Sequence, residues 1–367
     1  MNLTKATLIL DDGSRYEGYA FGAEKSVTGE VVFNTAMSGY PESLTDPSYA
    51  GQLMALTYPL IGNYGVPART VRPDGISIFM ESEKIHAGAI IISDYSYQCS
   101  HWNSVGSLAE WLKEEGIPGI YGIDTRALTK RLREQGVMIG TLVSGDSADE
   151  KAIRARLSAF HYNEVNFVDR VSCKEVITYN EGAGKKRVIL IDCGVKHNII
   201  RSLLKRDLTV IRVPWDYDFN RMEYDGLFIS NGPGDPDTCD AAVQNIRKAL
   251  GKEQPVCGIC MGNQLLAKAG GASIYKLKYG HRSHNQPVRM AGTDKCYITS
   301  QNHGYAVDSS TLGSEWEPLF INMNDGTNEG IRHRNKPFFS AQFHPEACSG
   351  PTDTEFIFDR FAESVCS

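Results

Sequence analysis

A cysteine between two glycines is the first feature of this sequence that could do chemistry. Cys260 stands in the run Gly258-Ile259-Cys260-Met261-Gly262, which follows apolar residues and leads into a helix-compatible stretch. A G-x-C-x-G turn between a strand and a helix is the pattern of a nucleophile elbow, with cysteine in place of serine. Side chains at the two glycine positions would clash in so tight a corner. Because amides at the start of the following helix favour the thiolate, Cys260 is a candidate nucleophile.

A second short run could supply the base that such a nucleophile needs. The apolar residues 338–343 predict a strand, and His344-Pro345-Glu346 follows them. Residues two apart share a face of an extended chain, so we expect Glu346 beside the His344 imidazole, with Pro345 stiffening the link. Cys260, His344 and Glu346 are therefore candidates for nucleophile, base and orienting carboxylate.

A glycine-rich turn could stabilise the negative charge that forms during such an attack. Gly232-Pro233-Gly234 comes shortly after the apolar run 226–229. Two glycines around a proline predict a tight turn whose amides can face the strand ends. Together with the amide of Met261, this turn suits an oxyanion hole, in which losing one donor typically costs about 2.7 to 4 kcal/mol.

The elements that must position these residues follow an α/β pattern in the second part of the chain. Short runs of Val, Ile and Leu at 188–191, 208–213 and 226–229 alternate with helix-compatible stretches. Such runs indicate buried parallel strands. We expect an open sheet that binds ligands at the carboxyl ends of its strands.

The first part of the chain, to about Val143, predicts a mixed α/β domain. The apolar run 6–10 meets the turn residues 11–14, which predicts a hairpin. Helical spacing predicts one helix over 105–112, before Gly116, and a second between Asp124 and Gly136. The pattern then weakens into small and charged residues. We therefore expect an N-terminal domain over 1–145, a linker region over 146–186 and a C-terminal domain over 187–367.

The composition excludes several classes of function. The chain has 367 residues, with 38 Lys and Arg against 44 Asp and Glu. A net charge of −6 argues against binding to nucleic acid or to an acidic membrane surface. No apolar run approaches the roughly 20 residues of a membrane helix, and the start does not have the pattern of a signal peptide. Nine scattered cysteines do not indicate a disulfide framework, so we expect a cytoplasmic protein.

The three segments around Gly232, Cys260 and His344 resemble, in this order, the class I (triad) glutamine amidotransferases. Four segments of the first part resemble the amino-terminal domain of the carbamoyl phosphate synthetase small subunit. They are Val31–Tyr40, Leu44–Tyr49, Leu56–Gly65 and Gly122–Arg126. The resemblance covers nearly the whole chain and is weakest at about 146–186. It implies an N-terminal domain that docks a large subunit and a C-terminal open, mostly parallel α/β amidotransferase domain.

The resemblance implies hydrolysis of L-glutamine, with ammonia passed to the large subunit of a heterodimer or a higher oligomer. In that scheme the Cys260 thiolate attacks the carboxamide, His344 protonates the departing ammonia and then activates water, and Glu346 orients the imidazole. The implied glutamine site comprises Ser48, Gly232, Gly234, Met261, Gln264, Asn302, Gly304 and Tyr305. ATP, magnesium and bicarbonate are expected on the large subunit, so no cofactor or metal is expected in this chain. Asn263 departs from the family, in which many members have His.

Other interpretations of single motifs are weaker. Cys257 and Cys260 have thioredoxin-like C-x-x-C spacing, but Cys257 is predicted inside the strand and not at a helix start. The two histidines in 280–285 have no Cys or carboxylate at zinc-ligand spacing, which favours a solvated or substrate-edge loop. The stretch 182–186 lacks key P-loop residues and is interpreted as the end of the linker.

Two alternative functions remain beside the leading one. The chain could serve another synthase or act as a stand-alone hydrolase of glutamyl amides, but the segments between Asn34 and Gly65 argue against both. A non-catalytic regulatory subunit could also keep the fold. The presence of Cys260, His344 and Glu346 argues against that hypothesis.

Overall fold

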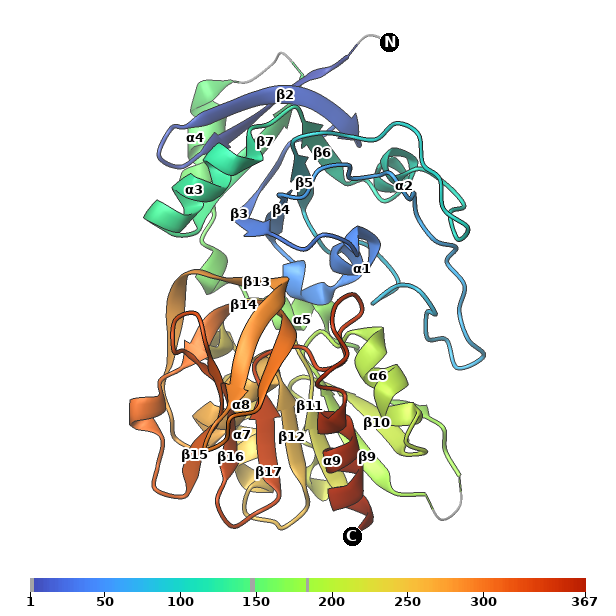
Figure 1. Cartoon of the computed structure of the whole chain (residues 1–367), viewed down its shortest axis with the longest axis vertical. Helices are drawn as coiled ribbons and strands as arrows, with labels where there is room; N and C mark the ends of the chain where they lie inside the picture. Colours follow the sequence, from blue (N-terminus) through green and yellow to red (C-terminus); the bar gives the residue numbers. More distant parts are fainter. Residues whose placement is uncertain (1–2, 146–148, 183–184) are drawn as a thin grey trace. The chain divides into compact units, whose positions relative to one another are not determined.

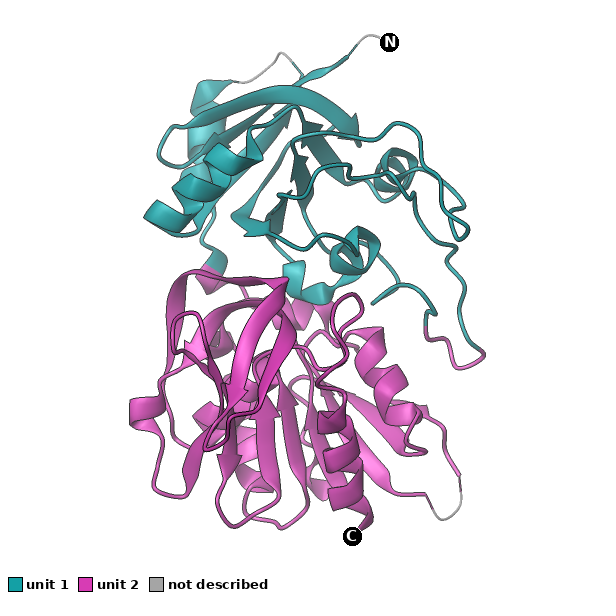
Figure 2. Cartoon of the chain, in the orientation of Figure 1, with its two compact units in different colours: residues 1–72, 77–162 teal, residues 73–76, 163–367 magenta. Residues whose placement is uncertain are grey.

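The computed structural model describes residues 3–145, 149–182 and 185–367, and these fall into two compact units (Figures 1 and 2). The first unit holds residues 1–72 and 77–162, and the second holds 73–76 and 163–367. The division falls inside the predicted linker region 146–186. Positions 146–148 and 183–184 of that region, and the first two residues of the chain, lie outside the described residues.

The predicted linker region contains regular structure. Its described elements are α4 (Glu150–Ala159), α5 (Phe167–Val171) and β8 (Ile177–Tyr179). Helix α4 belongs to the first unit, whereas α5 and β8 belong to the second. Of the helices described, none is long and apolar enough to cross a membrane.

The first unit is built on a closed barrel, in the order β1-β2-β6-β5-β4-β3-β7. Its strands are β1 (Lys5–Leu10), β2 (Arg15–Gly22), β3 (Val27–Asn34), β4 (Gln52–Leu56), β5 (Ala89–Ile92), β6 (Pro118–Tyr121) and β7 (Met138–Ser144). The predicted β1–β2 hairpin is confirmed by antiparallel pairing from Lys5–Tyr19 to Ile9–Arg15. Closure of the sheet through β1 and β7 was not part of the prediction.

The helices of the first unit are α1 (Tyr40–Thr45), α2 (Leu108–Glu114), α3 (Thr125–Gln135) and α4. The prediction for α3 is confirmed at both ends. The Asp124 side chain accepts a hydrogen bond from the Ala127 amide, and Gly136 ends the helix with φ 97°. Helix α2 begins later than predicted, because Ser107 caps it and Val105 lies outside it, exposed.

The second unit contains, in its described residues, a ten-stranded sheet in the order β14-β13-β15-β16-β17-β12-β11-β9-β10-β8. Its parallel strands are β9 (Arg187–Asp192), β10 (Thr209–Pro214), β11 (Gly226–Ile229), β12 (Val256–Ile259) and β17 (Phe338–Ala341). Antiparallel pairing adds β8, β13 (Ile274–Met290), β14 (Cys296–Val307), β15 (Trp316–Asn322) and β16 (Asn328–His333). The predicted parallel strands at 188–191, 208–213 and 226–229 are therefore confirmed.

Helices cover both faces of this sheet (Figure 1). They are α6 (His197–Leu204), α7 (Asp240–Ala249), α8 (Met261–Ala269) and α9 (Phe356–Cys366). Alternate strand residues enter two separate buried clusters: Ile189 and Leu227 pack with α7 and α8, whereas Leu190 and Phe228 pack with α6 and α9. Because both faces are buried, the strands are apolar throughout and not alternating.

A buried ion pair joins the carboxyl ends of β9 and β10. The Arg212 guanidinium lies 2.7 Å from Asp192 Oδ2. Asp192 Oδ1 accepts hydrogen bonds from the amides of Gly194 and Val195, at 2.9 and 2.8 Å. The pair therefore holds the loop that leaves β9, next to the strand ends where the candidate site lies.

Replacing Arg212 with methionine is expected to lower the free energy of unfolding by about 3–5 kcal/mol, because it leaves the Asp192 charge buried without its partner. Urea unfolding measures this cost. The matched control is Lys205→Met, which removes an exposed pair with Glu355 and is expected to cost at most about 1 kcal/mol. Equal costs for the two variants would contradict the expectation.

Candidate active site

Cys260 occupies the corner between β12 and α8. Its backbone has φ 55° and ψ −105°, a combination that residues other than glycine rarely adopt. Its amide donates to the Ala341 carbonyl of β17, at 2.8 Å. The strained strand-to-helix corner that the sequence predicts is therefore present, and it sets the thiol at the carboxyl end of the central strand.

Both glycines of the elbow are required by close backbone packing. A Cβ at Gly258 would lie 2.4 Å from the Gly262 carbonyl oxygen, and a Cβ at Gly262 would lie 2.2 Å from the Ile229 carbonyl oxygen. Such separations are well inside van der Waals contact. The elbow thus packs directly against β11, the strand that leads to the Gly232 turn.

His344 and Glu346 come from the loop that follows β17, the parallel neighbour of β12. His344 Nδ1 lies 2.6 Å from Glu346 Oε1, and both side chains are buried. The predicted contact is present, although Pro345 and Glu346 lie in a turn and not on extended chain. The His344 amide donates to the Ser300 carbonyl of β14, at 2.8 Å, which fixes the start of this turn.

The electrostatics of this pair suit acid–base chemistry. Burial lowers the pKa of His344, but the Glu346 charge and the neighbouring Cys260 thiol outweigh it and raise that pKa to about 10. Burial opposes ionisation of Glu346, yet the charges of Lys196 and His344 lower its pKa to about 2. His344 Nε2 has no hydrogen-bond partner among the described residues and is therefore free to exchange a proton with a substrate.

Lys196 is a site residue that the sequence interpretation missed. Its buried ammonium lies 3.0 Å from Glu346 Oε1 and donates to the Ala347 carbonyl, at 2.6 Å. Lys196 follows the carboxyl end of β9, which is where ligands bind in open α/β sheets. Its position after a predicted parallel strand was the signal that could have identified it.

Replacing Glu346 with glutamine is expected to move the alkaline limb of the pH–activity profile to lower pH. The Glu346 charge raises the pKa of His344, so without it the imidazolium loses its proton at lower pH. Loss of the orienting carboxylate should also reduce kcat by about 10²–10⁴-fold. Profiles of kcat and of kcat/KM for glutamine against pH measure both effects, with Glu363→Gln on the exposed surface of α9 as the control. An unshifted alkaline limb would rule out this electrostatic role for Glu346.

The Gly232 turn lies after β11, beside the elbow. A Cβ at Gly232 would lie 2.1 Å from the Cys193 carbonyl oxygen, so only glycine fits there. Two buried residues that the sequence interpretation did not select hold the turn against the end of β9. Ser230 Oγ accepts from the Cys193 amide, at 2.9 Å, and Asn231 Oδ1 accepts from the Lys196 amide, at 3.0 Å.

Four residues predicted to bind glutamine lie on α8 and β14 of the second unit. The Cys260 thiol donates to the Asn302 carbonyl, at 3.6 Å, and Gln264 Nε2 donates to the Tyr305 carbonyl, at 3.3 Å. The Tyr305 hydroxyl lies 2.8 Å from Asp235 Oδ2, just beyond the Gly232 turn. Gln264 Oε1 is buried and has no partner in the described part of the chain, as expected of an acceptor reserved for a ligand. Gly304, the fourth of these residues, lies on β14 between Asn302 and Tyr305.

The structure therefore brings together, within one unit, every predicted site residue except one. These are Cys260, His344, Glu346, Gly232, Gly234, Met261, Gln264, Asn302, Gly304 and Tyr305. The exception, Ser48, belongs to the first unit, in the short 3-10 helix Pro47–Tyr49, where its amide donates to Asp46 Oδ1, at 2.9 Å. Its part in a glutamine site stays a prediction.

Asn263, the departure from the family pattern, is fully buried beneath the elbow. Its Nδ2 donates to Gln342 Oε1, at 2.8 Å, and its Oδ1 accepts from the Ser340 hydroxyl, at 2.7 Å. Asn263 thereby ties α8 to β17 and its extension toward His344. Cys257 is a free thiol buried within β12, where burial raises its pKa, which does not suit a redox pair.

The interpretation of 280–285 as a loop, either solvated or at the edge of the substrate site, is wrong. These residues lie within β13, and His281, Arg282 and Ser283 are buried. Pairing of β13 with β14 places His281 beside His303, and Glu329 of β16 lies close to both, so this trio could in geometric terms hold a metal ion. Glu329 is the carboxylate that the 280–285 segment itself lacks. It stands 48 residues after His281 in the sequence but lies beside it in the fold.

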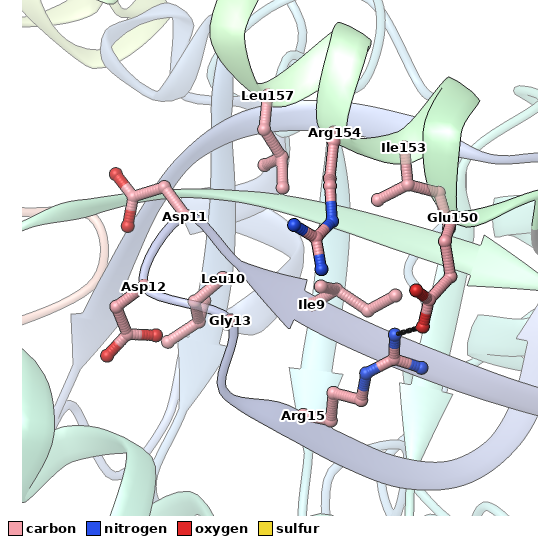
Figure 3. Close-up of a pocket in the computed structure, with 10 residues that line it drawn as sticks. All are labelled: Ile9, Leu10, Asp11, Asp12, Gly13, Arg15, Glu150, Ile153, Arg154 and Leu157. Carbon is pink, nitrogen blue, oxygen red and sulfur yellow. Dashed lines mark hydrogen bonds and ion pairs between the residues drawn. The ribbon is translucent and has the colours of Figure 1, made fainter.

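A hollow on the first unit, between the β1–β2 turn and α4, contains no predicted site residue (Figure 3). Charges of both signs line it, among them Asp11, Arg15, Glu150 and Arg154. Arg15 pairs with Glu150 across it. The chemistry-bearing residues thus remain those at the strand ends of the second unit.

Comparison with known proteins agrees with this geometry. Residues 189–364 match the family described as glutamine amidotransferase class-I, and residues 8–142 match that described as carbamoyl-phosphate synthase small chain, CPSase domain. The arginine-specific small chain of carbamoyl phosphate synthase from Saccharomyces cerevisiae is 47% identical over 372 residues, covering 99% of this chain and 89% of that protein. Its counterpart from Phaeosphaeria nodorum is also 47% identical, with 100% of this chain and 77% of that protein covered.

Longer proteins also contain a similar segment. The multifunctional protein CAD of Squalus acanthias is 52% identical over 360 residues, covering 98% of this chain but only 16% of that protein. The chain thus spans about a sixth of the length of such multifunctional relatives.

Proposed function

Since this chain belongs to the family of carbamoyl phosphate synthase small chains, we propose that it hydrolyses L-glutamine to glutamate and ammonia for carbamoyl phosphate synthesis. The observation that carries the proposal is the meeting of a strained elbow cysteine with a buried His344–Glu346 pair at the ends of adjacent parallel strands. A nucleophile, a base that interacts with it and a group that orients the base are the requirements for acyl transfer.

In the proposed reaction the Cys260 thiolate attacks the carboxamide carbon of glutamine. The negative charge that develops on the oxygen is stabilised by the amides of Gly232 and Met261. The His344 imidazolium gives its proton to the departing nitrogen, the carbon–nitrogen bond breaks, and ammonia leaves behind a glutamyl thioester. His344 then takes a proton from water, whose oxygen attacks the thioester to release glutamate and restore the thiol.

Glutamine binding is assigned to the groups that surround the elbow. Gln264, whose Oε1 has no partner in the described residues, offers an acceptor to the substrate ammonium. The Asn302–Tyr305 segment and the Gly232–Gly234 turn offer backbone groups to the substrate carboxylate and carboxamide. The resemblance adds Ser48 to this set, and its part in glutamine binding stays a prediction.

The proposed partner is a synthetase part that uses ATP, magnesium and bicarbonate. Relatives of this chain support two arrangements, a separate small chain or one part of a longer protein. The yeast relative is named a small chain, and the shark relative is named a multifunctional protein. Ammonia would pass from the amidotransferase unit to that synthetase part. The proposed location of the protein is the cytoplasm. Neither a metal nor a cofactor is assigned to the glutaminase step.

The test compares two nitrogen sources in the complete protein with its synthetase part. Glutamine and free ammonia should both support carbamoyl phosphate formation in the presence of ATP and bicarbonate, and glutamine should also yield one glutamate per ammonia released. If free ammonia works and glutamine does not, the chain is a regulatory unit and the proposal is wrong. If glutamine is hydrolysed but carbamoyl phosphate never forms, the chain serves another synthase.

A further inference from the structure

A buried polar cluster adjoins the proposed glutamine-binding segment of β14. His281 of β13, His303 of β14 and Glu329 of β16 are each less than a tenth exposed. His281 stands opposite His303 in the antiparallel pairing, and their rings meet edge to face with centroids 4.9 Å apart. The proposed mechanism uses none of these three side chains.

His281 lies between two carboxylates. Its Nε2 is 2.9 Å from Asp325 Oδ2, in the turn between β15 and β16, and its Nδ1 is 3.2 Å from Glu329 Oε1. Ionised carboxylates can only accept hydrogen bonds, so an imidazole that meets a carboxylate at each nitrogen satisfies both only as the imidazolium. Burial lowers the pKa of His281, but the two carboxylates outweigh it and raise that pKa to about 9.

The cluster reaches the reaction site through His303. This residue stands between Asn302, whose carbonyl accepts from the Cys260 thiol, and Gly304. Its Nδ1 lies 2.9 Å from the Tyr305 carbonyl oxygen, which also accepts from Gln264. A shift of the His303 ring would therefore move the carbonyl groups of Asn302 and Tyr305, which contact Cys260 and Gln264.

We propose that the His281 imidazolium, held between Asp325 and Glu329, is a positioning group for the glutamine-binding segment 302–305. It ties β13 to the β15–β16 turn and to β16, and supports the His303 ring from the opposite strand. This inference rests on the proposed function, because its effect appears in glutamine binding. His281 touches neither the substrate nor the reacting atoms.

The groups that face His281 account for its charge. They are Asp325 of the turn, Glu329 of β16 and His303 of β14; Tyr275 of β13 interacts with the two carboxylates, and Arg282 with His303. Burial, together with the charges of His281 and Arg282, lowers the pKa of His303 well below its ordinary value. His303 is therefore neutral at pH 7, and His281 is the cation between the two carboxylates.

Glu329→Gln in the complete protein tests the proposal, because glutamine keeps the shape of the side chain and removes one charge. Loss of an adjacent opposite charge lowers the pKa of an imidazolium by about 1–3 units. His281 should then lose its proton near neutral pH instead of near pH 9. The KM for glutamine should match that of the wild type at about pH 6 and rise about fivefold, the effect of one lost hydrogen bond, by about pH 8. The kcat should stay within about twofold at both pH values, because the triad is untouched.

Two further variants separate positioning from mere stability. Glu317→Gln on β15 removes a partly exposed carboxylate that pairs with Arg332 outside the cluster, so its KM should stay flat with pH. His281→Asn should raise KM at every pH without an inflection. Thermal unfolding of each variant, measured at the assay pH, identifies any rise in KM that follows from unfolding.

The outcomes are distinguishable. A wild type that releases no ammonia from glutamine defeats the proposed function, whatever the variants do. An active wild type with a pH-independent KM in Glu329→Gln overturns the positioning role of His281. The trio could also ligate an ion, so metal analysis of the purified wild type is included. One equivalent of metal, lost in Glu329→Gln, would likewise overturn the proposal.

Discussion

Replacing Cys260 with alanine is expected to abolish ammonia release from glutamine. The variant removes the sulfur that would form the thioester, and losses of about 10⁴-fold or more are typical when a nucleophile of this kind is removed. The fold should persist, because Cys260 is buried and alanine is only slightly smaller. Ammonia release from glutamine measures the loss, and carbamoyl phosphate formation from free ammonia should remain.

Cys257→Ala is the matched control for this variant. Cys257 is also a buried free thiol, three residues earlier on β12, and it packs in the cluster that contains Phe358 and Phe361 of α9. Its glutaminase activity should stay within about twofold of the wild type. Retained glutaminase in Cys260→Ala, or its loss in Cys257→Ala, would transfer the nucleophile role to another residue.

Replacing Gly262 with valine is expected to reduce glutaminase activity by about 10²-fold or more, although Gly262 contributes no reacting group. Its Cβ would lie 2.2 Å from the Ile229 carbonyl oxygen, so the elbow or β11 must move. A displacement of about 1 Å at a reacting group can cost about 10²-fold in rate. Overpacking should also lower the free energy of unfolding by about 1–3 kcal/mol. Glutaminase kinetics and urea unfolding measure the two effects.

Gly313→Ala is the control for the glycine substitution. A Cβ at Gly313 would meet nothing within 4 Å, and its backbone lies outside the positive-φ region. Neither activity nor stability should change appreciably. If Gly262→Val were as active as Gly313→Ala, the elbow would accommodate the extra side chain without displacing Cys260, and the prediction would be wrong.

Much of the second unit could be predicted because its signals are local. Continuous apolar runs mark β9, β10 and β11, and the glycine spacing around Cys260 marks the elbow. The caps of α3 are likewise set by single residues, Asp124 and Gly136. Each of these features depends on a few neighbouring residues, which is the range over which sequence patterns are informative.

The features that escaped prediction depend on pairing between distant segments. The barrel closes where Leu8 of β1 meets Leu142 of β7, and no local pattern encodes that register. The contacts of Lys196 with Glu346, and of His281 with Glu329, arise in the same way, because folding brings segments that are far apart in the sequence into one sheet. Ser48 was assigned by resemblance alone.

The order of strands in the second sheet has a consequence for protein synthesis. Cys260 is made with β12, but His344 follows β17, which pairs with β12 only after the intervening strands β13 to β16 have been synthesised. Long-range parallel pairing of this kind is formed slowly, after the loop between the strands has closed. A nascent or truncated chain therefore holds the thiol without its base. Under the proposed function, such a chain is expected to cleave no glutamine until the last parallel strand, β17, docks beside β12.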